Sequence, residues 1–203
     1  MALAAILLRL HAETIGNMND ARRMLDRAFA DYQARWPEET GAPHFREFLV
    51  GHVDAFERAL AIGHFTGSAW LVSADGRRVL LTHHRKLGLW LQLGGHADGD
   101  IDLARVALRE AEEESGLQNL EIEPGIFDLD RHRILARGAD PEHWHYDVRY
   151  VVRARGDEVF VVSDESHALA WREIAEVAAD EGADASVRRM ARKWVHRAVA
   201  AVP

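Results

Sequence analysis

A glycine-rich loop that leads into a short acidic helix constrains the fold of this chain more than any other feature. Gly94 and Gly95 form the loop, and the spacing of apolar residues predicts a helix capped by Asp102 and ended by Gly116. Three glutamates of this helix stand at i, i+3 and i+4, so their side chains share one face. These glutamates are Glu110, Glu113 and Glu114.

Two interpretations of this acidic face are open from the carboxylates alone. Like charges one turn apart repel one another, and a hard divalent cation such as Mg²⁺ or Mn²⁺ would convert that repulsion into coordination. A solvated helix face, which is the usual role of a run of charges, needs no ion. The residues around the helix have to decide between the two.

Those residues resemble the signature of the Nudix family, Gly-x5-Glu-x7-Arg-Glu-U-x-Glu-Glu-x-Gly-U, in which U is apolar. The half from Arg109 to Leu117 matches at every position, and Gly95 takes the place of the first glycine. The first glutamate of the signature aligns with Ile101, so a loop one residue shorter is expected to bring Asp100 into that position. The resemblance, at residues 95–117, favours the metal site over the solvated face.

The order of predicted elements indicates an α/β protein. Residues 1–62 form a helical N-terminal extension, in which Asn19 and Asp20 cap a helix ended by Pro37. Residues 63–203 form the Nudix-like domain, an α/β/α sandwich with a mixed sheet. In the extension the other helices are predicted around 3–10 and 45–60. In the domain the strands are predicted at 68–72, 79–82, 87–93, 122–127, 144–152, 159–162 and 169–171, and the closing helices at 174–179 and 185–199.

The resemblance also implies a reaction and a set of residues that perform it. Nudix proteins use Mg²⁺ or Mn²⁺ to hydrolyse a nucleoside diphosphate linked to another moiety X, and the substrate here is expected to be such a small molecule. The residues carried over are the metal ligands Glu110 and Glu114, Glu113 as ligand or general base, the Gly94 carbonyl as a further ligand, and Arg109 as the group that orients a glutamate. Glu165, six residues before Trp171, is a second candidate for the base; its alternative is a surface carboxylate or helix cap.

Candidate substrate contacts lie near the glycine loop. His84, Arg85 and Lys86 could hold phosphate, since arginine offers a bidentate fork and lysine a point charge, or they could form an ordinary charged turn. His96 lies inside the loop and could approach metal or phosphate. Trp90 could stack on a base, although strand tryptophans more often pack in a core.

A second polar pattern lies on the predicted strand 144–152. His143, His145 and Asp147 alternate and therefore share one face. This face is either an edge that contacts substrate or a further metal, or a solvent-exposed polar face.

Composition narrows the possible functions. The chain has 203 residues, no cysteine and a net charge of -8. Without cysteine there is neither a disulfide nor the acid/base thiol of an isopentenyl diphosphate isomerase-like reaction. The net charge argues against DNA or RNA as partner, including RNA cap removal. No segment has the pattern of a membrane span, so we expect a cytoplasmic protein. A homodimer is possible. A catalytically silent Nudix domain that senses a ligand or docks a partner is the alternative function.

Overall fold

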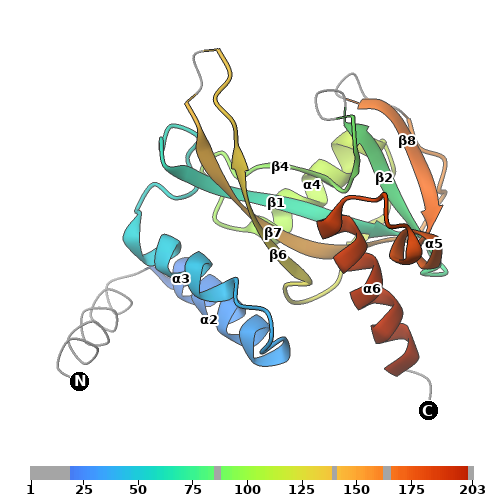
Figure 1. Cartoon of the computed structure of the whole chain (residues 1–203), viewed down its shortest axis with the longest axis horizontal. Helices are drawn as coiled ribbons and strands as arrows, with labels where there is room; N and C mark the ends of the chain where they lie inside the picture. Colours follow the sequence, from blue (N-terminus) through green and yellow to red (C-terminus); the bar gives the residue numbers. More distant parts are fainter. Residues whose placement is uncertain (1–18, 85–87, 139–140, 162–165, 201–203) are drawn as a thin grey trace.

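The computed structural model of the chain describes residues 19–84, 88–138, 141–161 and 166–200. Among these residues, two helices precede the sheet, one helix interrupts it and two follow it (Figure 1). The helices are α2 (Asp20–Arg35), α3 (Ala42–Gly51), α4 (Leu103–Ser115), α5 (Ile174–Ala179) and α6 (Ala185–Ala200). The strands are β1 (Gly63–Val72), β2 (Arg78–His84), β3 (Trp90–Leu91), β4 (Leu93–His96), β5 (Leu120–Ile122), β6 (Asp128–Ile134), β7 (His143–Ala154) and β8 (Ser166–Glu173).

Within the described residues, eight strands form one mixed sheet with the order β3-β2-β1-β7-β5. Strand β4 pairs with β1, β6 with β7, and β8 with β2. Strands β1 and β7 are parallel and pair over the whole length of β1, from Gly63 beside Trp144 to Val72 beside Arg153. This parallel pair is the centre of the sheet and carries the floor of the site described below.

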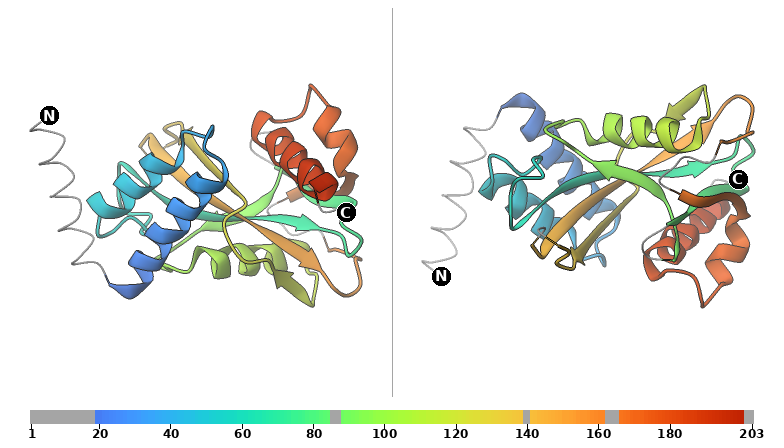
Figure 2. Two further views of the ribbon diagram at one scale, coloured as in Figure 1. Left: turned by 90° about the horizontal axis from the view of Figure 1, so that it is seen from below. Right: turned by 90° about the horizontal axis from the view of Figure 1, so that it is seen from above.

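Helices cover both faces of the sheet, as predicted for an α/β/α sandwich. Figure 2 shows α4 on one side and α5 and α6 on the other. Along β1 the side chains alternate: Ala69 and Leu71 pack in the core on the α4 side, whereas Trp70 and Val72 pack in the core beneath α5 and α6. Because both faces of β1 are covered, all ten of its residues are buried.

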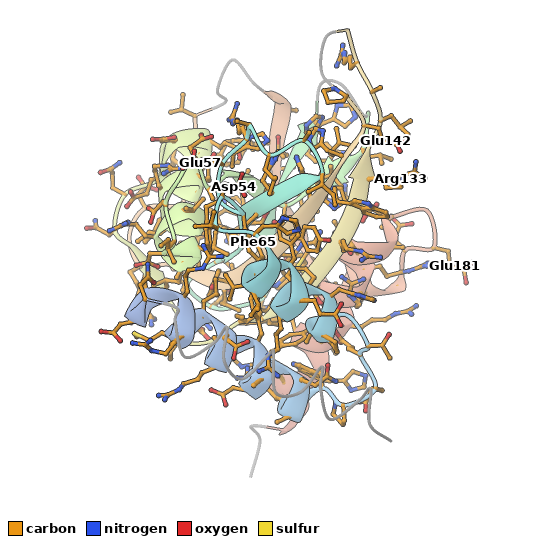
Figure 3. All side chains as sticks on the ribbon, turned by 90° about the vertical axis from the view of Figure 1, so that its left-hand side faces the viewer. Asp54, Glu57, Phe65, Arg133, Glu142 and Glu181 are labelled. Atoms are coloured by element: carbon orange, nitrogen blue, oxygen red, sulfur yellow. The ribbon has the colours of Figure 1, made fainter. Side chains whose placement is uncertain are left out.

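Helices α2 and α3 pack at one end of the sheet and share its core. Helix α2 is capped by Asn19, whose side chain accepts a hydrogen bond from the Arg22 amide at 2.9 Å, as predicted. Phe48 of α3 stacks on Tyr146 of β7, with ring centroids 3.9 Å apart. Phe65 of β1, labelled in Figure 3, lies in the same aromatic cluster.

Most predicted elements are confirmed, and four details are wrong. The helix predicted from Phe45 to Leu60 ends at Gly51, since residues 52–62 form turns. Of the strand predicted at 122–127 only Ile122 lies in a strand, because β5 ends there and residues 123–127 form the connection to β6. The prediction at 87–93 gives two short strands with Gln92 between them. Residues 159–161 form no strand. The expected helix at 3–10 lies outside the described residues.

The sequence also conceals the β6–β7 hairpin. Strand β6 reads Asp-Leu-Asp-Arg-His-Arg-Ile, and its charged residues on both faces hide the period of two. An ion pair joins Arg133 of β6 to Glu142, the residue before β7; both are labelled in Figure 3. No helix of the described residues has the length and apolar character needed to cross a membrane.

Candidate active site

A cleft of about 1120 Å³ opens beside the acidic face of α4. Its walls come from α4, from the glycines of β4 and from the N-terminus of α6, and its floor comes from β1, β7 and β6. The side chains that line it are polar for the most part, so the cleft suits a charged ligand better than an apolar one. The predicted residues that line it are His84, Gly94, His96, Arg109, Glu110, Glu113 and Glu114.

The ends of α4 are fixed as predicted, which sets the direction of its glutamates. Asp102 caps the helix by accepting a hydrogen bond from the Arg105 amide at 3.1 Å. Gly116 ends it with a φ of 70°, a left-handed conformation that favours glycine, and donates to the Glu112 carbonyl. Apolar residues of α4 face the sheet, so the opposite flank carries Glu110, Glu113 and Glu114 into the cleft.

The two glycines of β4 lie against the carboxylates of α4. The Gly94 amide donates a hydrogen bond of 2.8 Å to Glu114 Oε1. Gly95 has no side chain where the Glu110 carboxylate lies, and a β carbon at this position would overlap it. Arg109 donates to Glu110 Oε1 at 2.8 Å and to the His96 carbonyl at 3.2 Å.

Asp100, expected at the first acidic position of the signature, braces the start of α4. Its carboxylate accepts two hydrogen bonds from the Arg105 guanidinium, at 2.6 and 2.8 Å, and one from the Asp102 amide at 2.9 Å. The bond from Arg105 lowers the pKa of Asp100 below its usual range. The aspartate thus contacts the first turn of the helix, and its described bonds go to Arg105 rather than to Arg109.

Strand register builds the floor of the cleft as three cross-strand rows. His64 of β1 stands beside His145 of β7, which stands beside His132 of β6. The next row along the strands is Thr66, Asp147 and Asp130, and the third is Ser68, Arg149 and Asp128. Alternate residues of a strand face the same way, so these nine side chains share one face of the sheet. His143, His145 and Asp147 therefore face the cleft side of the sheet.

Asp147 is a buried centre of hydrogen bonds, with an exposed fraction of 2%. Thr66 and Ser68 donate to its Oδ1 at 2.9 and 2.7 Å, and Gln92 and Arg149 donate to its Oδ2 at 3.2 and 2.7 Å. Such a fully bonded carboxylate positions its partners, so it fixes the floor of the cleft. The interpretation of this strand face as solvent-exposed is wrong at Asp147.

Arg149 and the C-terminal helix neutralise the acidic floor. The Arg149 guanidinium is buried and lies 3.2 Å from Asp128 and 3.4 Å from Asp130. Arg189 of α6 also binds both carboxylates. Burial alone would raise the pKa of Asp130, but a hydrogen bond from His132 and the two guanidinium groups lower it well below its usual range. These ion pairs attach α6 to the floor.

Imidazoles gather where β1 and β7 begin. The ring centroid of His64 lies 5.0 Å from that of His96 and 4.8 Å from that of His145. Burial, reinforced by the neighbouring imidazoles, lowers the pKa of His64 to about 4 and that of His145 to about 2. Both rings are therefore neutral near pH 7 and keep a lone pair for a proton or metal ion.

The structure assigns no place in the cleft to four predicted residues, three because they are not described and one because it packs elsewhere. Arg85, Lys86 and Glu165 lie outside the described residues. Trp90 is half-buried and packs against the core beneath α5 and α6, with its ring 5.2 Å from that of His83. It is not part of the lining of the cleft among the described residues.

Several residues of the cleft and its floor were not predicted from the sequence, and those on β1 and β6 carry a pattern that becomes visible only once the strands are paired. Alternating polar residues on β1 and β6 continue the pattern already recognised on β7. Pairing the three strands would have brought them together. The missed residues are His64, Thr66, Ser68, Gln92, Asp130, Arg131, His132, Arg149 and Arg189.

Comparison with known proteins agrees with this geometry. The family model described as the NUDIX domain matches residues 64–194. No curated protein matches the chain by sequence.

Three solved structures illustrate what the chain is similar to. The Ap4A hydrolase of C. elegans is 17% identical, with a TM-score of 0.53 over 67% of this chain and 98% of that one. The MutT protein of Methanosarcina mazei Go1 is 16% identical, with a TM-score of 0.53 over 68% and 97%. The E. coli dihydroneopterin triphosphate pyrophosphohydrolase is 17% identical, with a TM-score of 0.53 over 66% and 95%. At these identities the similarity shows a shared fold.

Proposed function

This chain belongs to the Nudix family of pyrophosphate-bond hydrolases, and we propose that it cleaves a diphosphate bond in a small nucleoside diphosphate derivative. The cleavage would depend on Mg²⁺ or Mn²⁺. One observation carries the proposal: Glu110, Glu113 and Glu114 project from α4 into a polar cleft of a size that accommodates a nucleotide.

The residues present fit a hard divalent cation. Carboxylate oxygens are the ligands that Mg²⁺ and Mn²⁺ prefer. Glu110 occupies the space left by the missing side chain of Gly95, and Glu114 is held by the Gly94 amide. We propose Glu110 and Glu114 as the main ligands, with Glu113 or the Gly94 carbonyl as a further one. A bound ion would neutralise phosphate charge and lower the pKa of a coordinated water.

The chain's own groups have distinct roles in this proposal. Arg109 orients Glu110 through their hydrogen bond and so acts as a positioning residue. Glu113 is exposed on the cleft side of α4, where its carboxylate could take a proton from the attacking water. Glu165 is the other candidate for that base.

Two cations that follow β2 in the sequence are proposed to receive the phosphates. These are Arg85 and Lys86, which lie outside the described residues. Arginine offers phosphate a bidentate fork of N–H donors, and lysine offers a point charge. His84 and His96, which line the cleft, are proposed as further polar contacts.

A phosphate-release panel tests the proposal. The panel covers nucleoside triphosphates, nucleotide sugars, CDP-alcohols, ADP-ribose and dinucleotides, each with Mg²⁺ or Mn²⁺. We expect metal-dependent turnover of at least one compound. Binding of a ligand without turnover of any compound would contradict hydrolysis and would favour the silent, ligand-sensing domain.

Two glutamate variants test the metal site. Glu114→Gln keeps the shape of the side chain but removes its charge, so kcat should fall by about 10³-fold or more if Glu114 holds the catalytic metal. Glu112→Gln is the matched control, because Glu112 lies on the same helix, is exposed and does not line the cleft. Equal rates for Glu114→Gln and Glu112→Gln would remove Glu114 from the mechanism.

The general base is assigned by a second comparison. Glu113→Gln and Glu165→Gln are measured over a range of pH with saturating metal. The variant that loses the acidic limb of the kcat profile identifies the base. If neither loses it, the base is another group.

A further inference from the structure

We infer that His64, His96 and His145 form a binding site for a divalent transition-metal ion of the Zn²⁺ class, separate from the carboxylates of α4. The inference does not rest on the proposed hydrolysis, because it depends on a different set of side chains and a different ligand chemistry. A bound ion at this site would stand at the end of the cleft where β1 and β7 begin.

The arrangement of the three rings fits a metal ion. Each histidine comes from a different strand, β1, β4 or β7, and one ring nitrogen of each lies within 4.8 Å of the other two. Nitrogen ligands about 2.0–2.1 Å from a tetrahedral Zn²⁺ lie about 3.4 Å apart. Small rotations of the side chains would therefore bring the three nitrogens onto one ion, without movement of the backbone.

His64 supplies a second, independent observation. Its exposed fraction is 3%, and both of its ring nitrogens lack a hydrogen-bond partner among the described residues. Buried polar atoms are almost always paired, so an unpaired imidazole inside a sheet needs an explanation. A metal ion bound to one of its nitrogens supplies the missing partner.

The chemistry of the two candidate sites differs. Neutral imidazole nitrogens suit Zn²⁺, Co²⁺ and Ni²⁺, whereas carboxylate oxygens suit Mg²⁺ and Mn²⁺. The sites are neighbours along β4, since Gly95 lies against Glu110 and His96 is the next residue. Arg109 connects them through its bonds to Glu110 and to the His96 carbonyl.

The site would keep one coordination position open. Three protein ligands with a fourth position for water or substrate are typical of catalytic rather than structural zinc. The imidazoles of His96 and His145 line the cleft, so that fourth position would face a ligand in it. His143, whose Nε2 lies 3.3 Å from the Nε2 of His145, is the nearest neighbour that could orient or supplement the set.

Metal binding by the unmodified 203-residue chain is the first test. The protein is stripped with a chelator, and Co²⁺ and Zn²⁺ are then titrated separately, with Mg²⁺ as the control ion. We expect one Zn²⁺ per chain, an intense visible Co²⁺ spectrum typical of tetrahedral nitrogen coordination, and anomalous scattering at the zinc edge between the three rings. Zinc scattering at another position, or no binding, would overturn the inference.

Variants then separate the two sites. His96→Gln and His145→Gln should each weaken Zn²⁺ binding by at least about 100-fold, whereas His44→Gln, an exposed histidine on α3, should not. Glu110→Gln with Glu114→Gln should leave Zn²⁺ binding intact. Loss of Zn²⁺ binding in that double variant, with retention in the histidine variants, would place the ion on α4 and refute the histidine site. Because neither His96 nor His145 is fully buried, both variants are expected to fold, and their circular dichroism checks this.

Discussion

Replacement of Gly95 by alanine should remove most of the hydrolytic activity while leaving the protein nearly as stable as before. A β carbon at this position would stand 2.5 Å from the Glu110 carboxyl carbon, whereas ordinary contact begins at 3.4 Å. The carboxylate must therefore retreat by about 0.9 Å. Misplacement of a reacting or metal-binding group by about 1 Å lowers rates by about 100-fold, which corresponds to about 2.7 kcal/mol of transition-state stabilisation.

Stability should change little, because the group that gives way is the end of a flexible side chain. We expect the free energy of unfolding to change by no more than about 0.5 kcal/mol. The assay combines kcat/KM on a compound that the wild type hydrolyses, urea denaturation, and Mn²⁺ binding followed by electron paramagnetic resonance. Mn²⁺ affinity should fall together with kcat/KM.

Gly67→Ala is the matched control, because Gly67 is the cross-strand partner of Gly95. Its β carbon would stand 2.7 Å from the Leu103 carbonyl oxygen and 3.0 Å from Val106, so α4 itself would have to move. Overpacking of this kind destabilises a protein by about 1–3 kcal/mol. Unchanged Mn²⁺ affinity and kcat/KM in Gly95→Ala, or destabilisation equal to that of Gly67→Ala, would refute the role assigned to Gly95.

Three further changes test the framework around the cleft. Arg149→Met leaves carboxylates buried without their cation, so urea denaturation should show a loss of about 3–5 kcal/mol, and a loss below 1 kcal/mol would contradict the buried ion-pair network. Asp130→Asn tests acid stability. Because the pKa of Asp130 is depressed in the folded protein, its contribution to stability is present above the unfolded pKa of about 3.9 and is lost as pH falls through the folded pKa. The free energy of unfolding of the variant should therefore fall less steeply than that of the wild type below about pH 5. Parallel slopes of unfolding free energy against pH for the variant and the wild type would show that Asp130 does not contribute to acid unfolding. Asp100→Asn should reduce the free energy of unfolding by less than about 1 kcal/mol, since its partner Arg105 is 67% exposed, and a larger loss in thermal denaturation would show a tighter link to α4.

The acidic helix could be predicted from the sequence because its signals are local. A capping residue, a terminating glycine and three glutamates at helical spacing lie within fifteen residues of one another. The strands that carry dense apolar runs, such as β1, were recognised for the same reason. Such patterns can be recognised without knowing which distant residues contact the element.

The floor of the cleft could not be predicted, because its contacts join distant parts of the chain. Thr66 and Asp147 are separated by 81 residues, and only the register of β1 against β7 brings them together. His64 was overlooked for a related reason: an isolated histidine at the start of a strand carries no signal until its cross-strand neighbours are known. Strand β6 was missed because its buried and exposed faces are both charged.

From the contacts of Lys193 we expect the cooperative unit of folding to be larger than the region matched by the family model. The ammonium of this lysine, on α6, donates to Tyr32 at 2.7 Å and to Asp128 at 2.6 Å, and it is paired with Glu39 at 2.7 Å. One cation thus connects the helices before the sheet, the cleft floor and the last helix. A chain that starts at Gly63 would lack Tyr32 and Glu39, two of the three partners of Lys193. We therefore expect such a chain to unfold at lower denaturant concentration, with α6 loosened where it closes the cleft.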